Sequence, residues 1–160
     1  MRYDILNRFN NAVQFTADID CAESASEATK KGLAVLWALK NGADLAGTDL
    51  TGANLTGATL AGADLTGATL AGANLTRADL RGATLAGAIL RGATLAGATL
   101  TRADLRWADL TGADLTRADL RWADLTKATL AEADLRWATL TGAILTGATL
   151  AGANMPDPVR

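Results

Sequence analysis

The sequence contains no histidine, which removes the side chain that most often serves as a general base or a metal ligand. Its single cysteine, Cys21, cannot form an intramolecular disulfide. The only serines are Ser24 and Ser26, at the expected start of a helix. Nucleophilic catalysis therefore lacks its residues, and the sequence predicts a protein that is not an enzyme and has no metal, cofactor or small-molecule substrate.

The sequence also lacks any apolar run of the ~18 residues needed to span a membrane. Its start, MRYDILNRFN, lacks the apolar core of a signal peptide, so we expect a cytoplasmic protein with no membrane contact. The net charge is only -2: residues 43–75 carry three acids and no base, and residues 76–140 carry eight acids and nine bases. Since neither part is strongly basic, direct binding to nucleic acid is not expected.

The sequence does contain one five-residue motif, which is repeated from Ala43 to Asp157. Leu recurs at every fifth position from Leu45 to Leu150, with Met155 in the last place, and Ala stands two residues earlier except at Thr48. A period of five would spiral the Leu set around a helix and would alternate it between the faces of a straight strand. Short extended sides that end in bends bring every Leu and Ala inward, which predicts a β-solenoid with three or four sides per coil.

The run A-[D/N/T]-L-x-x, as in ADLTG, ADLRW and ANLTR, resembles the pentapeptide-repeat family. The resemblance implies an all-β solenoid: a right-handed quadrilateral parallel β-helix with twenty residues per coil, or five to six coils over the 23 pentads. One difference is that the central residue is always Leu until Met155, without the Phe that many relatives mix in. The uniformity is also that of an engineered or consensus-like solenoid.

The second residue after each Leu is expected to lie at a corner of the coil. It is Gly in 14 pentads and another residue in nine, including Arg77 and Trp107. Because positive φ would strain those two side chains, the sequence indicates a corner that does not require it. Where Asp, Asn or Thr stands just before Leu, it is interpreted as turn chemistry. Arg two residues beyond an Asp is expected to offset the repulsion between stacked carboxylates.

Residues 1–42 are predicted to form an N-terminal cap. Residues 13–19 alternate like a half-buried strand with Tyr3–Leu6 as hairpin partner, joined by a turn at Asn10 and Asn11. Ser24 and Glu27 have the spacing of a capping box, and Gly42 ends an amphipathic helix of ~15 residues. Its apolar face, with Leu33, Leu36 and Trp37, is expected to cover the open end of the Leu column, with Trp37 as a lid over the first coil.

After Gly152 the five-residue motif is interrupted by Pro156 and Pro158, which cannot donate to a backbone ladder. The solenoid is therefore predicted over residues 43–157, followed by a tail of residues 158–160. We expect the C-terminal end to be blunted by this tail or covered by another subunit.

The candidate interaction residues are the Arg-Trp pairs of a fifteen-residue repeat: Arg106, Trp107, Arg121, Trp122, Arg136 and Trp137. Exposed aromatic side chains beside Arg are typical of protein interfaces. The alternative is that Trp was copied when this unit was duplicated. At twenty residues per coil the three Trp would occupy three different corners, as a staircase.

Two functions remain open from the sequence. The first is a non-enzymatic scaffold that presents its regular outer surface to a protein partner or associates with itself through its C-terminal coil. The second is a DNA mimic that acts on DNA gyrase or topoisomerase, because members of the resembled family that protect gyrase from quinolones look like acidic duplex DNA. The balanced charge of most coils favours the first.

Overall fold

The computed structural model describes residues 1–156, which begin with an antiparallel hairpin of β1 (Arg2–Leu6) and β2 (Val13–Asp18). The predicted pairing and turn are confirmed, and Asn11 takes the left-handed backbone (φ 57°) that Asn tolerates. The predicted alternation fails at its first residue, because the Val13 side chain is 53% exposed. The register shifts between Ile5 and Leu6, so the alternation of β2 does not continue through Val13.

The helix α1 (Glu27–Asn41) follows the hairpin. Its N-cap is Ser26, whose Oγ accepts from the Thr29 amide, and not Ser24 as the capping-box spacing predicted. Glu27 is unavailable for a capping box because its carboxylate accepts from the Tyr3 hydroxyl and from Lys30. The C-terminal end is as predicted: Gly42 is left-handed (φ 68°), and its amide donates to the Ala38 carbonyl.

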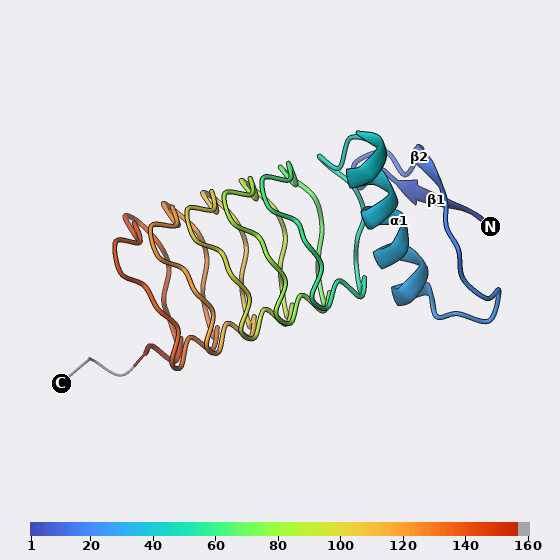
Figure 1. Cartoon of the computed structure of the whole chain (residues 1–160). Helices are drawn as coiled ribbons and strands as arrows, with labels where there is room; N and C mark the ends of the chain where they lie inside the picture. Colours follow the sequence, from blue (N-terminus) through green and yellow to red (C-terminus); the bar gives the residue numbers. More distant parts are fainter. Residues whose placement is uncertain (157–160) are drawn as a thin grey trace.

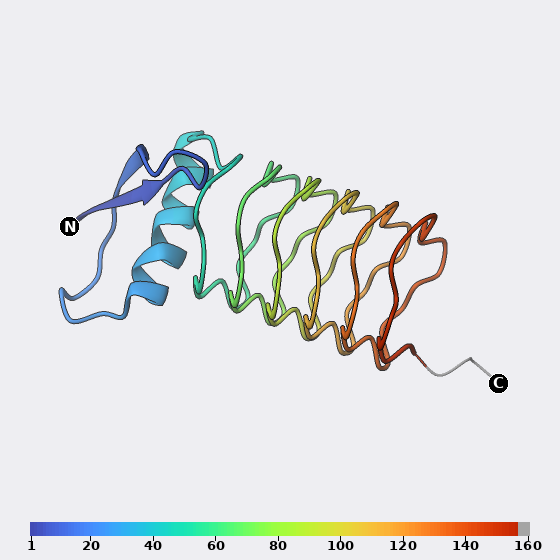
Figure 2. The ribbon, with the colours of Figure 1, turned by 180° about the vertical axis from the view of Figure 1, so that it is seen from behind.

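Residues 43–156 form a coil in which positions twenty apart are paired (Figure 1, Figure 2). Parallel bridges join each residue before a Leu to its equivalent on the next coil, from Asp49 with Thr69 to Asp134 with Asn154. In the same ladder the Leu95 amide donates to the Asp114 carbonyl at 2.6 Å. Twenty residues make four pentads, so each coil has four sides, and each side is too short to form a regular strand.

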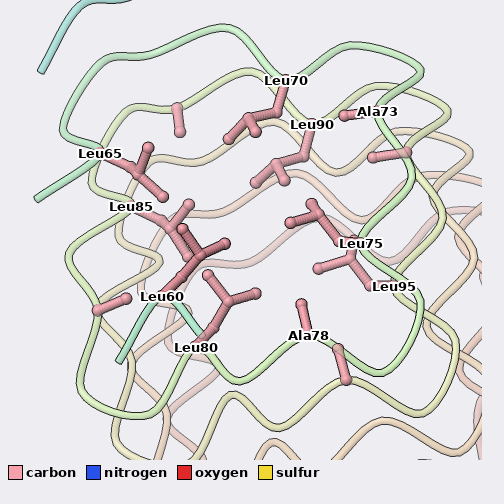
Figure 3. Packing of buried hydrophobic residues seen from close by; sticks show 14 of the residues in the cluster. Leu60, Leu65, Leu70, Ala73, Leu75, Ala78, Leu80, Leu85, Leu90 and Leu95 are labelled. Atoms are coloured by element: carbon pink, nitrogen blue, oxygen red, sulfur yellow. The ribbon is translucent and has the colours of Figure 1, made fainter. Parts of the chain in front are cut away.

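The interior is a stack of Leu side chains, as the sequence predicts. Figure 3 shows Leu60 next to Leu80 and Leu75 next to Leu95, each pair one coil apart. All Leu from Leu45 to Leu135 at the repeat position are at most 3% exposed. Thr48, the exception among the Ala positions, is fully buried, and its hydroxyl donates to the Leu45 carbonyl at 2.7 Å. A hydroxyl is tolerated there because it is hydrogen-bonded.

The prediction that the corner does not require positive φ was wrong. The residue two positions after each repeat Leu, from Gly47 to Gly152, has φ between 56° and 72°. This set includes Arg77 and Trp107. The Ala98 amide donates to the Leu95 carbonyl three residues earlier, with Gly97 between them at φ 65°. A hydrogen bond from the fourth residue of a turn to the carbonyl of the first, with positive φ at the third residue, identifies a type II β-turn. Trp and Arg therefore stand where the backbone favours Gly.

The N-terminal segment lies across the first coil, with α1 next to the coil and the hairpin beyond it (Figure 1). The Asn54 amide donates to the Ala28 carbonyl of α1 at 2.9 Å. A Cβ at Gly32 would collide with the Asn54 carbonyl oxygen, so only glycine allows this approach. The end of β1 also contributes, because the Asp49 amide donates to the Leu6 carbonyl at 2.8 Å.

The cap residues named from the sequence take different places. Val35 is fully buried, whereas Leu36 is 43% exposed and was wrongly assigned to the buried face of the helix. Leu33 and Trp37 are half-buried against the core. The Trp37 ring stacks on Phe15 of β2 with 6.3 Å between ring centroids, so this indole joins the helix to the hairpin. The buried residues of α1 are Gly32, Ala34, Val35 and Ala38, so Leu36 lies outside the buried face of the helix.

At the other end the interior opens gradually. Leu140, Leu145 and Leu150 are half-buried, and Ile144 and Met155 are 48% and 42% exposed. Pro156 is the last described residue. The predicted end of the solenoid at Asp157 and the tail of residues 158–160 lie outside the described part of the chain.

Replacing Leu95 by Ala should lower the free energy of unfolding by about 2–5 kcal/mol, because the side chain is fully buried and its neighbours are held by the coils on either side. The control is Thr94→Ala, which shortens an outward side chain. It should change the free energy of unfolding by ~0.5 kcal/mol or less. Urea denaturation followed by circular dichroism measures both. Equal losses would show that Leu95 does not point inward.

Candidate interaction surface

The three exposed Trp lie on three different corners of the coil, as the predicted staircase requires. Pairing between positions twenty apart places Trp107 in one corner column with Lys127, Trp122 with Gly142 and Trp137 with Arg117. Their side chains are 62%, 61% and 61% exposed. The surface around them is therefore a series of corners, each with one indole, and not a continuous aromatic ladder.

Each indole packs on the corner residue one coil away. The Lys127 ammonium nitrogen lies 4.2 Å from the centroid of the Trp107 ring, and the Arg117 guanidinium lies 5.6 Å from that of Trp137. The Trp122 ring covers Gly142 so closely that a Cβ there would collide with it. These contacts orient the rings, because a cation over an aromatic face is favourable. They still leave more than half of each indole open to solvent.

The Arg of each Arg-Trp pair bends back onto the Asp two residues earlier. Arg106 donates from Nε to Oδ1 of Asp104 at 2.8 Å and from Nη2 to Oδ2 at 2.6 Å. Arg121 with Asp119 and Arg136 with Asp134 have the same two-pronged geometry. The predicted compensation of the stacked carboxylates is confirmed, since Arg106 also lies 3.9 Å from Asp124 on the next coil.

These arginines hold the carboxylates in their charged form. Hydrogen bonds from Arg106 lower the pKa of Asp104, and those from Arg136 lower the pKa of Asp134 in the same way. The same Asp also closes the turn, because Oδ1 of Asp104 accepts from the Arg106 amide at 3.1 Å. This Asx geometry recurs at the other Asp and at Asn54 and Asn74, which confirms the predicted turn chemistry for Asp and Asn.

Within residues 1–156, no helix has the length and apolar character required to cross a membrane. In the same part of the chain, no three Cys, Asp or Glu side chains converge in a way that could hold a metal ion. The cytoplasmic location stays a prediction.

Comparison with known proteins identifies the repeat. The family model for pentapeptide repeats matches residues 41–77, 78–117 and 118–155. The chain belongs to the pentapeptide repeat family. Pentapeptide repeat proteins are right-handed quadrilateral β-helices, are generally not enzymes and often mediate protein interactions. Among curated proteins, no sequence matches this chain.

Solved structures of pentapeptide repeat proteins resemble the chain. The protein alr5209 of Nostoc PCC 7120 is 31% identical over 80% of this chain and 88% of its own, with a TM-score of 0.57. Rfr23 of the cyanobacterium Cyanothece 51142 is 38% identical over 57% of this chain and 63% of its own, with a TM-score of 0.56. A trypsin-treated form of QnrB1, a plasmid-mediated fluoroquinolone resistance protein, is 18% identical with a TM-score of 0.47, too distant to carry a functional argument.

Two grooves that the sequence did not predict run along neighbouring corners of this pentapeptide repeat protein. One, of about 460 Å³, is lined by Arg81, Gly82, Thr101, Arg102, Arg121 and Trp122, and we call it the basic groove. The other, of about 420 Å³, includes Arg77, Arg117 and Trp137 but also Asp114 and Asp134, and we call it the mixed groove. Aligning the sequence in columns of residues twenty apart would have revealed both grooves, because each corner then shows three Arg beside two Asp.

The variant Arg106→Gln should raise the pKa of Asp104 towards the ordinary value of about 3.9. In the native protein the Arg106 hydrogen bonds hold this pKa below its unfolded value, so the pair stabilises the fold above the unfolded pKa. That stabilisation is lost as the pH falls through the folded pKa. Carboxyl chemical shifts followed by NMR during acid titration measure the effect, and Arg81→Gln should leave Asp104 unchanged. An unaltered Asp104 titration in Arg106→Gln would contradict the assignment.

Proposed function

We propose that this chain is a non-enzymatic interaction scaffold whose outer surface binds a protein partner or a second copy of itself. The observation that carries the proposal is the exposure of Trp107, Trp122 and Trp137 at corners with positive φ. A side chain other than Gly in the left-handed region costs roughly 1–2 kcal/mol. Large apolar rings that occupy such positions and remain mostly exposed support a role in binding.

The packing of the indoles on their own coil offsets part of this cost, and duplication of a fifteen-residue unit accounts for their spacing. Neither explains why the rings remain exposed. Trp and Arg are the residue types that most often dominate the binding energy of interfaces. For this reason we favour the interface over the by-product of duplication.

The proposal gives the N-terminal segment and the coils different roles. In this proposal residues 1–42 are the cap and residues 43–157 are the β-helix of five to six coils. The hydrogen bonds from Asn54 to Ala28 and from Asp49 to Leu6 support the cap, because they satisfy backbone groups that the first coil would otherwise expose. The Arg-Trp pairs stand on the coils far from this cap.

The C-terminal coil is the surface we propose for self-association. Its Leu140, Leu145 and Leu150 are only half-buried, unlike the sealed interior of the earlier coils. Trp137 adjoins this end, because it lines a hollow of about 300 Å³ together with Asn154 and Met155. A second copy placed there would cover apolar side chains and continue the backbone ladder.

Replacing Trp107, Trp122 and Trp137 together by Gly should leave the fold intact, because each of these corners favours the backbone freedom of Gly. Association should be lost. Circular dichroism checks the fold, and sedimentation velocity over a range of concentrations compares the association of the variant with that of the wild type. A folded triple variant that associates as the wild type does would contradict the role of the indoles.

The alternative of a DNA mimic acting on gyrase or topoisomerase is less well supported. A mimic needs continuous negative charge, but the carboxylates of Asp79, Asp104, Asp119 and Asp134 are each paired with an Arg. The purified protein at micromolar concentration should therefore not inhibit supercoiling by DNA gyrase, measured by gel electrophoresis of a relaxed plasmid. Clear inhibition would favour mimicry over the scaffold.

A further inference from the structure

The last described coil, residues 137–156, contains no charged side chain and is the longest uncharged stretch of the sequence. Its outward residues before Leu or Met are Thr139, Ile144, Thr149 and Asn154, whereas the coil before it has Asp119, Asp124, Thr129 and Asp134 at the paired positions. The Ile144 side chain is 48% exposed. Because the centres of protein interfaces are depleted of charged residues, this end of the molecule has the composition of an interface.

The edge of this coil also carries backbone groups without partners. In the earlier coils the Leu amides and the Ala carbonyls bond to the next coil: the Leu125 amide donates to the Ile144 carbonyl, and the Ala123 carbonyl accepts from the Ile144 amide. The equivalent groups of the last coil have no backbone partner within residues 1–156: the amides of Leu145 and Leu150 and the carbonyls of Ala143 and Ala148. An unpaired strand edge of this kind invites pairing with another chain.

The arrangement of these groups fits a second copy of the same coil. On each side of the coil one amide and one carbonyl flank an outward residue, as the Leu145 amide and the Ala143 carbonyl flank Ile144. A strand that runs in the opposite direction presents the same two groups in reverse order, so each amide meets a carbonyl. Only another coil end matches all four sides at once. The first coil of a second copy cannot serve, because α1 and β1 lie on it and bond to Asn54 and Asp49 (Figure 1).

We propose that the last coil binds the last coil of a second copy, end to end and antiparallel, about a twofold axis perpendicular to the stack of coils. This inference rests on the proposed self-association of the scaffold and specifies its partner and its geometry. The contact covers the half-buried side chains of Leu140, Leu145 and Leu150. Each copy contributes about twenty residues, at the lower end of the roughly 20–30 per partner in interfaces of standard size.

The rise of the coil fixes the register of the two copies. Successive coils are about 4.8 Å apart, so the end of the stack is a ramp with a step where the last coil closes. Two such ramps meet without overlap only when their steps coincide, which puts the twofold axis at the corner of Gly147, midway along residues 137–156. Ile144 then lies opposite the partner's Thr149, and Thr139 lies opposite the partner's Asn154.

In this register the free backbone groups pair with each other. The Leu145 amide donates to the carbonyl of the partner's Ala148, and the Leu150 amide donates to the carbonyl of the partner's Ala143. Inward Leu side chains of one copy lie over inward Ala side chains of the other, so large and small residues alternate across the contact.

The double variant Ile144→Asp with Thr149→Asp places carboxylates directly opposite each other across this contact. Sedimentation velocity over a range of concentrations should show a dimer for the wild type. The variant should raise the Kd of the dimer by at least about tenfold, because like charges that face each other across paired strands repel. Both positions face outward, and circular dichroism verifies that the variant is folded.

The matched control is Thr69→Asp with Asn74→Asp, which adds two carboxylates at successive outward positions of an inner coil. This control should change the Kd of the dimer by less than about twofold. Equal losses in the two double variants, or a wild type that stays monomeric up to about 100 µM, would overturn the proposal. Species that keep growing beyond a dimer would indicate head-to-tail stacking and would overturn it as well.

Single cysteines test the register, in a Cys21→Ser background. Opposite residues of an antiparallel pair that share no hydrogen bonds lie about 4.5 Å apart at Cα, which a disulfide can bridge. A mixture of the Ile144→Cys and Thr149→Cys proteins should therefore form a disulfide-linked dimer on mild oxidation, measured by non-reducing electrophoresis, and neither protein should do so alone. A linked dimer of Ile144→Cys alone would place the axis at that residue and contradict the register.

The triple Trp variant separates this inference from the role of the indoles in the scaffold. If the triple Trp variant loses association while Ile144→Asp with Thr149→Asp retains it, the indole surface stands and the end-to-end contact does not. If the Asp variant becomes monomeric while the triple Trp variant still dimerises, the end-to-end contact stands and the indole surface does not.

Discussion

Each side of this coil ends in a turn whose third residue must be left-handed, and most other features of the molecule depend on that constraint. The hydrogen bond from the Ala98 amide to the Leu95 carbonyl closes such a turn around Gly97. Because the chain turns after every fifth residue, Ala and Leu point inward on every side. The corner residue, in contrast, always projects outward. A side chain other than Gly at the corner gains exposure but pays a backbone cost.

The second dependence is that each coil is completed by its neighbours. The Leu95 side chain is covered by the coils on either side, and its amide donates to Asp114 on the next coil. A first coil lacks one neighbour, and here the main chain of α1 and the end of β1 supply the missing partners. Gly32 shows how close this approach is, since no side chain fits between the helix and the Asn54 carbonyl. The helix thus substitutes for part of a coil in both packing and hydrogen bonding.

Much of this fold could be predicted from the sequence, because the five-residue period excludes a helix and a straight strand and leaves a coil of short sides. The period alone allowed three or four sides per coil, and the family resemblance indicated four. The hairpin and the end of α1 at Gly42 were also predictable from local signals. Three features were not. The presence of Arg77 and Trp107 at the corner argued against a left-handed backbone there. Tyr3 and Lys30 bind the Glu27 carboxylate that a capping box needs. The exposure of Leu36 depends on which face of α1 the rest of the protein covers. In each case a tertiary contact or constraint overrode a local preference.

The candidate surface was harder to predict because its chemistry runs perpendicular to the chain. Along the sequence, acids and bases between residues 76 and 140 nearly balance, which indicates a neutral surface. Across the coils the same charges gather at particular corners: three Arg line each of the two grooves, beside Asp79 and Asp119 at one corner and Asp114 and Asp134 at the other. In a coil of fixed register, a substitution therefore changes one column without altering the interior. The Leu stack and the corner turns set the shape, and the outward positions remain free to specify a partner.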